Sequence, residues 1–291
     1  MCGHCGCGEG SQTTVLNLRT GEEIRMEREP REHTHADGTR HTHTHDHEHV
    51  HADGTRHSHH HHDHTAPVGE IVELEARILA KNESFAERNR SWFKGREILA
   101  LNLVSSPGAG KTTLLERTIR DLRDDLRLFV IEGDQATAND GERIRAAGAA
   151  AVQVNTGTGC HLEADMVGRG LRELRPDIGS VVMIENVGNL VCPAMFDLGE
   201  RAKIVILSVA EGEDKPLKYP HMFRAASVMI LNKIDLLPHV DFDVGQAVAN
   251  ARQVNPHITV LQLSARSGEG LDAWYGWLRR EAGTVRNTAF T

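Results

Sequence analysis

Seven short apolar runs, rich in Val, Ile and Leu, alternate with amphipathic stretches through the later part of this sequence. They read ILALNLVSS, RLFVIEGD, AAVQVNT, SVVMIENV, KIVILSV, SVMILNK and TVLQLS. Continuous β-branched runs between helical patterns are typical of parallel strands that are buried on both faces of a sheet. The sequence therefore predicts an α/β fold with a doubly wound, mostly parallel sheet, in which ligands bind at the carboxyl ends of the strands.

The first part of the chain has a different composition. Residues 1–67 contain very few large apolar side chains. A segment of that kind cannot bury enough surface to offset the entropy of ordering it, so we predict a disordered tail over 1–67. Residues 68–291 are long enough for a sizeable core and are predicted to form one domain, which opens with an amphipathic helix over about 70–93.

Charge and hydropathy exclude several classes of protein. The net charge of −8 gives no electrostatic footprint for nucleic acid or an anionic membrane. There is no apolar run of 18 or more residues, and no basic stretch followed by an apolar one at the start. We therefore expect neither a membrane span nor secretion, and a cytoplasmic location. Five cysteines, three of them within the first seven residues, favour reduced thiols and metal binding over disulfides.

The stretch SSPGAGKTT, residues 105–113, lies between the first apolar run and a helical pattern. A P-loop wraps backbone amides around phosphate, extends a lysine to the terminal phosphates and places a hydroxyl on Mg²⁺. The strict pattern has glycine where this chain has Ser105, and a structural glycine turn is the alternative. The predicted nucleotide-binding residues here are Gly108, Ala109, Gly110, Lys111, Thr112 and Thr113, of which Lys111 and Thr112 are also predicted to be catalytic.

Two further acidic residues end apolar runs. VVMIENVG carries Glu185, followed by Gly188, where a P-loop enzyme places an acidic group near Mg²⁺ and a glycine amide near the γ-phosphate. Glutamate stands where aspartate is usual, and its longer side chain suggests a contact through water. Asp134, closing VIEGD, is a candidate magnesium or water-positioning carboxylate, with a helix cap as the alternative. We predict catalytic roles for Glu185 and Asp134.

The base-binding motifs follow near the end of the chain. LNKID provides Asn232, Lys233 and Asp235, and a carboxylate there can accept the N1 and N2 hydrogens of guanine, which adenine lacks. LSARSGEG provides Ser264 and Ala265, in a loop that can contact the guanine O6. Each motif alone is weak, but the whole ordered set predicts a site for GTP.

Residues 33–64 form a histidine-rich tract. HADGTRH occurs at 35–41 and again at 51–57, and aspartates lie among the histidines. Imidazole binds nickel, copper and zinc, so we predict metal binding, with a purification tag or a solvated linker as alternatives. An internal, duplicated tract of mixed composition argues against a tag. The predicted ligands are His33, His35, His41, His43, His45, His47, His49, His51, His57, His59, His60, His61, His62 and His64.

The opening MCGHCGCGEG predicts a second metal-binding element, a cysteine clip over residues 2–7. Cys2 and Cys5 have the spacing that lets two thiolates converge on one ion, and Cys7 adds a third. A thioredoxin-type redox pair is the alternative, but that motif follows a strand and begins a helix, and no such pattern surrounds this one.

Together these motifs resemble the HypB family, SIMIBI-class P-loop GTPases of the hydrogenase nickel-incorporation pathway. The resemblance rests on MCGHCGCGEG, NLVSSPGAGKTTLLE, VIEGDQ, VNTGTGCHLEADM, ENVGNLVCPAMFDLGE, EGEDKPLKYPHMF, NKIDLLP and SARSGEG. It implies a cytoplasmic metallochaperone that dimerises with GTP and hydrolyses it slowly. Such a protein works with a HypA-like nickel chaperone to deliver Ni²⁺ to the large subunit of a [NiFe] hydrogenase.

The folded part holds a further candidate metal site in GCH and NLVCP, on loops leading out of strands at the nucleotide-binding edge. A buried structural cysteine is the alternative for either motif alone. In the resembled family these residues bind metal, which implies Cys160, His161 and Cys192 as ligands of Zn²⁺ or Ni²⁺. Three ligands leave an open position for transfer, and a twofold dimer could bring two such sets together.

Two other functions fit parts of the sequence. One is a metal storage and buffering protein with a regulatory nucleotide site, and the other is a urease-type nickel-insertion GTPase. The complete nucleotide motifs favour GTP hydrolysis over storage alone. The urease-type protein would not explain the three cysteines of the clip.

Overall fold

The computed structural model describes residues 14–18, 20–25, 31–34, 40–43, 49–50, 56–57, 68–134, 139–157 and 159–288. The chain divides into two compact units. The first comprises Met1–Arg25 and Ile78–Thr291, and the second comprises Met26–Arg77. Each unit is described separately below.

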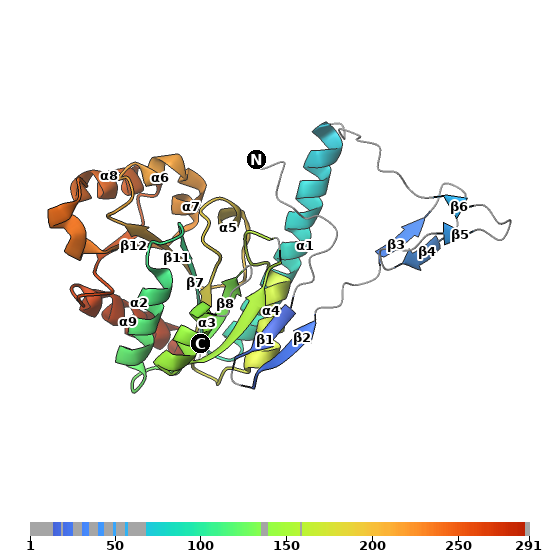
Figure 1. Ribbon diagram of the computed structural model, residues 1–291, viewed down its shortest axis with the longest axis horizontal. Coiled ribbons are helices and arrows are strands. Elements are labelled where there is room, and N and C mark those ends of the chain that lie inside the picture. The colour runs from blue at the N-terminus through green and yellow to red at the C-terminus, as the bar shows by residue number, and fades with distance from the viewer. Residues whose placement is uncertain are drawn as a thin grey trace. The chain divides into compact units, whose positions relative to one another are not determined.

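A nine-stranded, mostly parallel sheet runs through the first unit, in the order β13-β12-β11-β7-β10-β8-β9-β1-β2 (Figure 1). The seven apolar runs all form strands of it. They are β7 Leu99–Ser105, β8 Leu128–Asp134, β9 Ala150–Asn155, β10 Val181–Glu185, β11 Ala202–Ser208, β12 Val228–Asn232 and β13 Thr259–Gln262. These seven pair in parallel, which confirms the predicted fold class.

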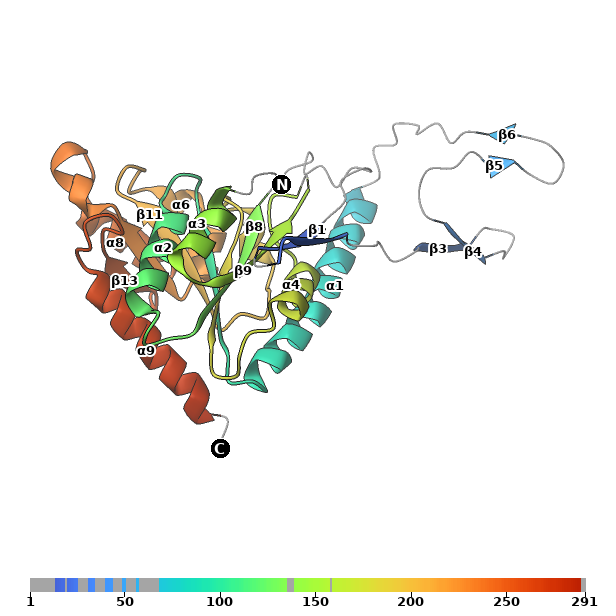
Figure 2. The ribbon, with the colours of Figure 1, turned by 60° about the horizontal axis from the view of Figure 1, so that its bottom comes forward.

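Helices cover both faces of this sheet (Figure 2). Their bounds are α1 Val68–Lys94, α2 Lys111–Leu122, α3 Asn139–Ala147, α4 Ala164–Leu174, α5 Cys192–Met195, α6 Lys215–Lys218, α7 Pro220–Ala225, α8 Val244–Val254 and α9 Leu271–Thr288, with a 3-10 helix η1 over Ile234–His239. The predicted helix over about 70–93 is the central part of α1.

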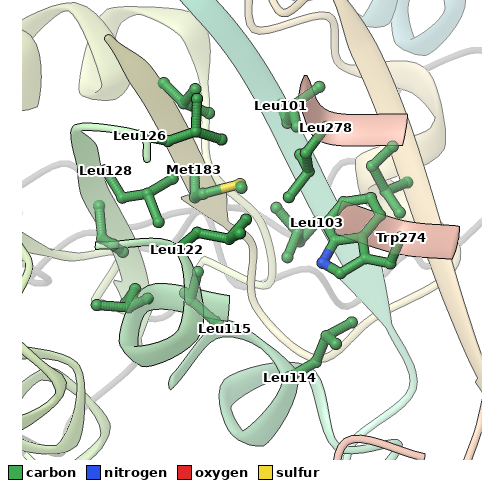
Figure 3. Packing of buried hydrophobic residues seen from close by; sticks show 14 of the residues in the cluster. Leu101, Leu103, Leu114, Leu115, Leu122, Leu126, Leu128, Met183, Trp274 and Leu278 are labelled. Carbon is green, nitrogen blue, oxygen red and sulfur yellow. The ribbon is translucent and has the colours of Figure 1, made fainter. Parts of the chain in front are cut away.

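Successive side chains of a strand point to opposite faces of the sheet, so each strand contributes residues to the hydrophobic core on either face. Figure 3 shows Leu101 and Leu103 of β7 packed with Leu114 and Leu115 of α2 and with Trp274 of α9. The opposite face forms a second cluster, which includes Val104 of β7 with residues of α7 and α8. The carboxyl end of β7 is thereby fixed from both sides, and this end carries the P-loop.

An antiparallel hairpin, β1 Thr14–Asn17 and β2 Glu22–Arg25, extends the sheet beyond β9. Val15 lies opposite Val154 and is 2% exposed, and Leu18 just after the strand is also buried. The hairpin departs from the expectation of a disordered tail over 1–67. A few apolar residues suffice here because the main sheet already supplies the surface that they cover.

The second unit contains two short antiparallel ladders, formed by β3 Arg31–Thr34 with β4 Arg40–His43 and by β5 His49–Val50 with β6 Arg56–His57. In each ladder the first strand lies just before one copy of the duplicated sequence, and the second strand includes the last two residues of that copy. His33 lies opposite His41 in the first ladder, and His49 lies opposite His57 in the second. The ladders also depart from the expectation of a disordered tail, and the repeat has a matching backbone pairing in both copies.

Candidate functional site

The P-loop joins β7 to α2 at the carboxyl edge of the sheet. Gly108 and Gly110 have φ values of 76° and 93°, a left-handed conformation that favours glycine. A Cβ on Gly110 would lie 2.6 Å from Asn232 Nδ2, so that position also excludes a side chain by steric contact. Because α2 begins at Lys111, its first backbone N–H groups lack partners within the helix and can bind phosphate.

The two predicted catalytic residues of the P-loop meet the acidic end of β10. Lys111 Nζ and Thr112 Oγ1 each donate to Glu185 Oε1 at 2.7 Å. The Glu185 side chain is only 3% exposed, and its Oε2 atom is buried with no hydrogen-bond partner among the described residues. Carboxylate and hydroxyl oxygens are ligands that Mg²⁺ prefers, so this pair fits a magnesium ion, while Lys111 fits the phosphates that accompany it.

A second carboxylate lies beside Thr112. Thr112 Oγ1 donates to Asp140 Oδ2 at 3.4 Å, and Asp140 accepts from Arg143 at 2.8 Å. Asp140 belongs to none of the motifs predicted from the sequence, and its place in the first turn of α3, soon after VIEGD, was the usable signal. The backbone of Asp134 lies at the end of β8, a neighbour of β10 in the sheet. Asp134 therefore ends at the same edge as Glu185.

The base-binding motifs are attached directly to the P-loop. Asn232 Nδ2 donates to Ala109 O at 2.9 Å, and Lys233 Nζ donates to Gly108 O at 2.7 Å. Asn232 Oδ1 accepts from Ala265 N at 3.1 Å, so one asparagine ties together the three loops that the sequence analysis assigned to the nucleotide.

Asp235 and Ser264 have contrasting surroundings. Asp235 Oδ1 is buried and has no hydrogen-bond partner within the described part of the chain. Ser264 is fully buried, and its hydroxyl accepts from Ser267 N at 3.0 Å. The Ser264 hydroxyl thus stabilises its own loop. The Asp235 carboxylate can still accept a hydrogen bond from a donor such as a guanine N–H.

The loop that follows β10 approaches the P-loop closely. A Cβ on Gly188 would lie 3.2 Å from both the N and the Cα atoms of Pro107. Such a contact is tighter than usual for a Cβ, so a side chain here would require Pro107 to shift by a few tenths of an ångström. Gly188 is therefore placed beside the P-loop, as the sequence predicted for a residue that meets the γ-phosphate.

Cys192, further along the same loop, meets Cys160 and His161 from the loop between β9 and α4, and the three side chains could hold a metal ion. The ligand atoms of Cys160, His161 and Cys192 all lie within 4.8 Å of one another. The two sulfur atoms are 3.1 Å apart, well beyond the bond length of about 2.05 Å in a disulfide. Cys160 Sγ is 3.7 Å from His161 Nδ1. The spacing suits thiolates and an imidazole that converge on one ion.

The histidine of this cluster is prepared to bind metal. Burial lowers the pKa of the His161 imidazole to about 4, so the ring is neutral near pH 7, and the neutral ring is the form that ligates metals. Its Nε2 atom is buried without a hydrogen-bond partner in the described ranges. The ring packs against Phe196, with 4.0 Å between ring centroids.

One loop carries both the Glu185 carboxylate, predicted to be catalytic, and Cys192 of the cluster. It runs from Glu185, the last residue of β10, to Cys192, the first residue of α5. Within it, Asn189 Nδ2 donates to Cys160 O at 3.3 Å, and Asn189 Oδ1 accepts from Val191 N at 2.8 Å. The metal cluster is thus joined to the nucleotide site by a short covalent and hydrogen-bonded path.

The chain is similar to proteins of one known family. The model of the CobW/HypB/UreG nucleotide-binding domain matches residues 99–262. Hydrogenase maturation factor HypB of Rhizobium leguminosarum bv. viciae is 60% identical over 212 residues, which cover 73% of this chain and 71% of that protein. The chain belongs to the HypB family of hydrogenase maturation factors.

Two solved HypB structures share the fold. Crystal structures of HypB from Archaeoglobus fulgidus and of HypB from Helicobacter pylori in complex with nickel both align with a TM-score of 0.66 at 36% identity. Each alignment covers 70% of this chain, together with 99% and 96% of the respective structures. The family resemblance predicted from the motifs is confirmed.

Most of the metal ligands predicted in the tail lie outside the described residues. The clip residues Cys2, Cys5 and Cys7 lie outside the described residues, as do His35, His45, His47, His51, His59, His60, His61, His62 and His64. His33, His41, His43, His49 and His57 fall on the four short strands of the second unit. Across the described ranges, no helix combines the length and apolarity that a membrane span requires.

Proposed function

We propose that this HypB-family protein hydrolyses GTP, stores nickel and delivers it to the large subunit of a [NiFe] hydrogenase during maturation. In this proposal residues 68–291 are the GTPase domain and residues 1–67 are a metal-binding tail, although its 14–25 hairpin joins the main sheet. The single observation that carries the proposal is the loop from Glu185 to Cys192, which joins a phosphate site to a thiolate and imidazole cluster.

Hydrolysis would use the groups gathered at the P-loop. Thr112 and Glu185 would hold Mg²⁺, which would supply positive charge to the phosphates of the nucleotide. Lys111 leaves its contact with Glu185 for the transferred phosphoryl and stabilises the charge that develops there. The carboxylates of Asp134 and Asp140 are candidates for orienting the attacking water or the water molecules around the ion.

Selection of guanine rests on Asp235. Its buried oxygen without a partner can accept from guanine N1 and N2, which form a donor pair that adenine does not present. A site built to pair with two donors rejects a base that leaves it unsatisfied, because an unpaired buried carboxylate is costly. Asn232 and Lys233 hold this loop against the P-loop.

The cluster of Cys160, His161 and Cys192 is the proposed transfer site for Ni²⁺, and it could also bind Zn²⁺. Three protein ligands leave a position open to a donor or acceptor protein, which suits transfer better than permanent binding. We further propose a homodimer, whose twofold axis would bring two clusters together, and exchange with a HypA-like nickel chaperone. Nickel bound by the related Helicobacter pylori HypB supports this choice of cargo.

The histidine tract and the cysteine clip are proposed to bind metal ahead of transfer. The cross-strand pairs His33 with His41 and His49 with His57 support this, because each places the last histidine of a repeat opposite a histidine position just before that repeat. Imidazoles on a tail can share ions with neighbouring imidazoles, which suits storage of several weakly held equivalents.

A deletion strain tests the proposal against its alternatives. Loss of hydrogenase activity that is restored by added nickel, with urease activity unchanged, is the expected result. Loss of urease activity alone would favour the urease-type GTPase. A strain that loses only its tolerance of excess nickel, with normal hydrogenase at low nickel, would favour storage and buffering. Complementation of the deletion strain with the Cys192→Ala variant, compared with the unmodified protein, tests whether the cluster is needed.

A further inference from the structure

Four buried polar side chains connect the end of β10 with the turn that carries Cys192. Asn186 Nδ2 donates to Asn102 Oδ1 at 3.3 Å, and Asn102 Nδ2 donates to Glu200 Oε1 at 3.0 Å. Lys203 Nζ lies 3.6 Å from the same Glu200 oxygen. We call Asn186, Asn102, Glu200 and Lys203 the buried relay.

One end of the relay holds the turn after Cys192. Lys203 Nζ donates to Pro193 O at 2.7 Å and to Phe196 O at 3.2 Å. Pro193 directly follows Cys192, and the Phe196 ring packs on His161. A shift of the ammonium would therefore move the backbone beside one ligand and the ring beside another.

The other end of the relay holds the loop that carries His161. Asn186 Oδ1 accepts from Leu162 N at 3.1 Å, and Leu162 directly follows His161. Asn186 itself is anchored to the sheet, because its own N–H donates to Leu103 O at 3.0 Å. The relay thus spans from the backbone beside His161 to the backbone beside Cys192.

The burial of these groups shows what the relay can contribute. Asn102 and Asn186 are 0% and 1% exposed, and the side chains of Lys203 and Glu200 are 7% and 6% exposed. Two carbonyls accept hydrogen bonds from the ammonium, and the Glu200 carboxylate pairs with its charge at 3.6 Å. Replacing a buried ion pair by apolar residues is often neutral or stabilising, so such a pair is a weak source of net stability. Its contribution here is to position the backbone, because Lys203 fixes where the carbonyls of Pro193 and Phe196 lie.

We propose that the buried relay positions the metal ligands Cys160, His161 and Cys192, with Lys203 as the principal positioning residue. The proposal rests on the metal site of the proposed function. Groups around a metal site that orient its ligands are usually tied to the ligand side chains. In this protein they act through the backbone next to His161 and Cys192, and they reach it from inside the sheet.

The test uses the full chain carrying Cys2→Ser, Cys5→Ser and Cys7→Ser. The sequence has five cysteines, so Cys160 and Cys192 are then its remaining thiols. Co²⁺ bound by thiolate gives a sulfur-to-metal charge-transfer band, which imidazoles of the histidine tract cannot produce. Titration with Co²⁺, followed at this band, reports the affinity and ligand geometry of the cluster alone.

The decisive variant adds Lys203→Met and Glu200→Gln together, so that neither buried charge is left without its partner. We expect the affinity for Co²⁺ to fall about 10–100-fold, the range typical when groups that orient metal ligands are removed. The visible bands of the bound ion should also shift, because the ligand geometry relaxes. Asn102→Leu, which breaks the relay without touching a ligand-bearing segment, should act in the same direction and decides the question if the double variant fails to fold.

Two controls separate the possible failures. Asn250→Ala removes a comparably buried contact on α8, from Nδ2 to Glu213 O at 2.9 Å, and should leave the Co²⁺ band unchanged. Cys192→Ala should lower the affinity for Co²⁺ and weaken the band, because Cys160 is then the one thiol left in the sequence. If Cys192→Ala does so but folded relay variants keep full affinity and an unchanged spectrum, the relay proposal is wrong and the metal site stands. If Cys192→Ala leaves both the affinity and the band unchanged, both are overturned.

Discussion

A single carboxylate oxygen, Glu185 Oε1, accepts from both Lys111 and Thr112. The residues predicted to bind phosphate and Mg²⁺ thus contact each other through Glu185. When a nucleotide binds, Lys111 has to exchange its contact with Glu185 for a contact with phosphate. Lys111 is the cation of this set and is 12% exposed at its side chain, so its charge acts in a poorly solvated place.

Replacing this lysine isolates its contribution. Lys111→Ala should lower GTP hydrolysis by at least about 100-fold, the scale on which removal of one charge-stabilising group acts. Hydrogenase maturation should fail in parallel, while nickel still binds the separate tail. Phosphate release and equilibrium dialysis measure the two properties, with the exposed Lys94→Ala as the charge-matched control. Hydrogenase activity at the unmodified level in low nickel would contradict the assignment.

The guanine assignment can be tested by inverting one hydrogen bond. Asp235→Asn keeps one acceptor oxygen for the N1–H but replaces the other by an amide donor, which opposes the N2 amino group of guanine and pairs with the C2 carbonyl oxygen of xanthine. Preference should therefore shift from GDP to XDP in competition binding. Asp243→Asn, at a carboxylate that caps α8 by accepting from Gln246 N, is the control and should leave the preference for GDP unaltered.

The hairpin β1–β2 is an element that the sequence did not predict. The seven strands of the main sheet were predictable because each is a continuous apolar run. The hairpin was not, because Val15 and Leu18 are isolated in a polar segment and gain their burial from β9 and α3. Asp140 and the buried relay were missed for a related reason. Their roles depend on partners far away in the sequence, such as Asn102 with Glu200.

The hairpin should contribute measurably to stability. Leu18 is 8% exposed in the core cluster, and a Cβ on Gly141 of α3 would lie 2.6 Å from its Cδ1 atom. Leu18→Ala should lower the free energy of unfolding by about 2 kcal/mol, the lower end of the range for such truncations. Ile24→Ala, on the same hairpin but 39% exposed, should change it far less. Urea unfolding curves compare the two, and equal midpoints would mean that the hairpin is not part of the cooperative unit.

The histidine tract is an element whose removal should affect metal capacity alone. Deletion of residues 32–64 should remove several weaker nickel equivalents, because each repeat supplies paired imidazole positions. GTP hydrolysis should barely change, since the P-loop and Glu185 lie in the other unit of the chain. Equilibrium dialysis that finds the same nickel stoichiometry before and after deletion would overturn the storage role.

At the scale of the whole molecule, the central question is how the nucleotide site and the metal cluster influence each other. The loop from Glu185 to Cys192 contains Gly188, packed against Pro107 of the P-loop, and Asn189, hydrogen-bonded to Cys160 O. A loop that orders around γ-phosphate and Mg²⁺ and relaxes after hydrolysis is a known type of switch. If this loop also holds a metal thiolate, the GTP and GDP states must bind metal differently.

Thermodynamic linkage requires the effect of nucleotide on metal binding to equal the effect of metal on nucleotide binding. Couplings between two sites are typically ~1–3 kcal/mol, or about 5–150-fold in affinity, and metal must alter nucleotide binding by the same factor. We expect hydrolysis to change the geometry of Cys160, His161 and Cys192 and so to time nickel release. The measurement is a nickel titration of a variant lacking residues 1–10 and 32–64, loaded with GDP or with a non-hydrolysable GTP analogue. Equal affinities in the two states, with Cys192→Ala leaving binding unaltered, would mean that the cysteine is structural and that release is timed elsewhere.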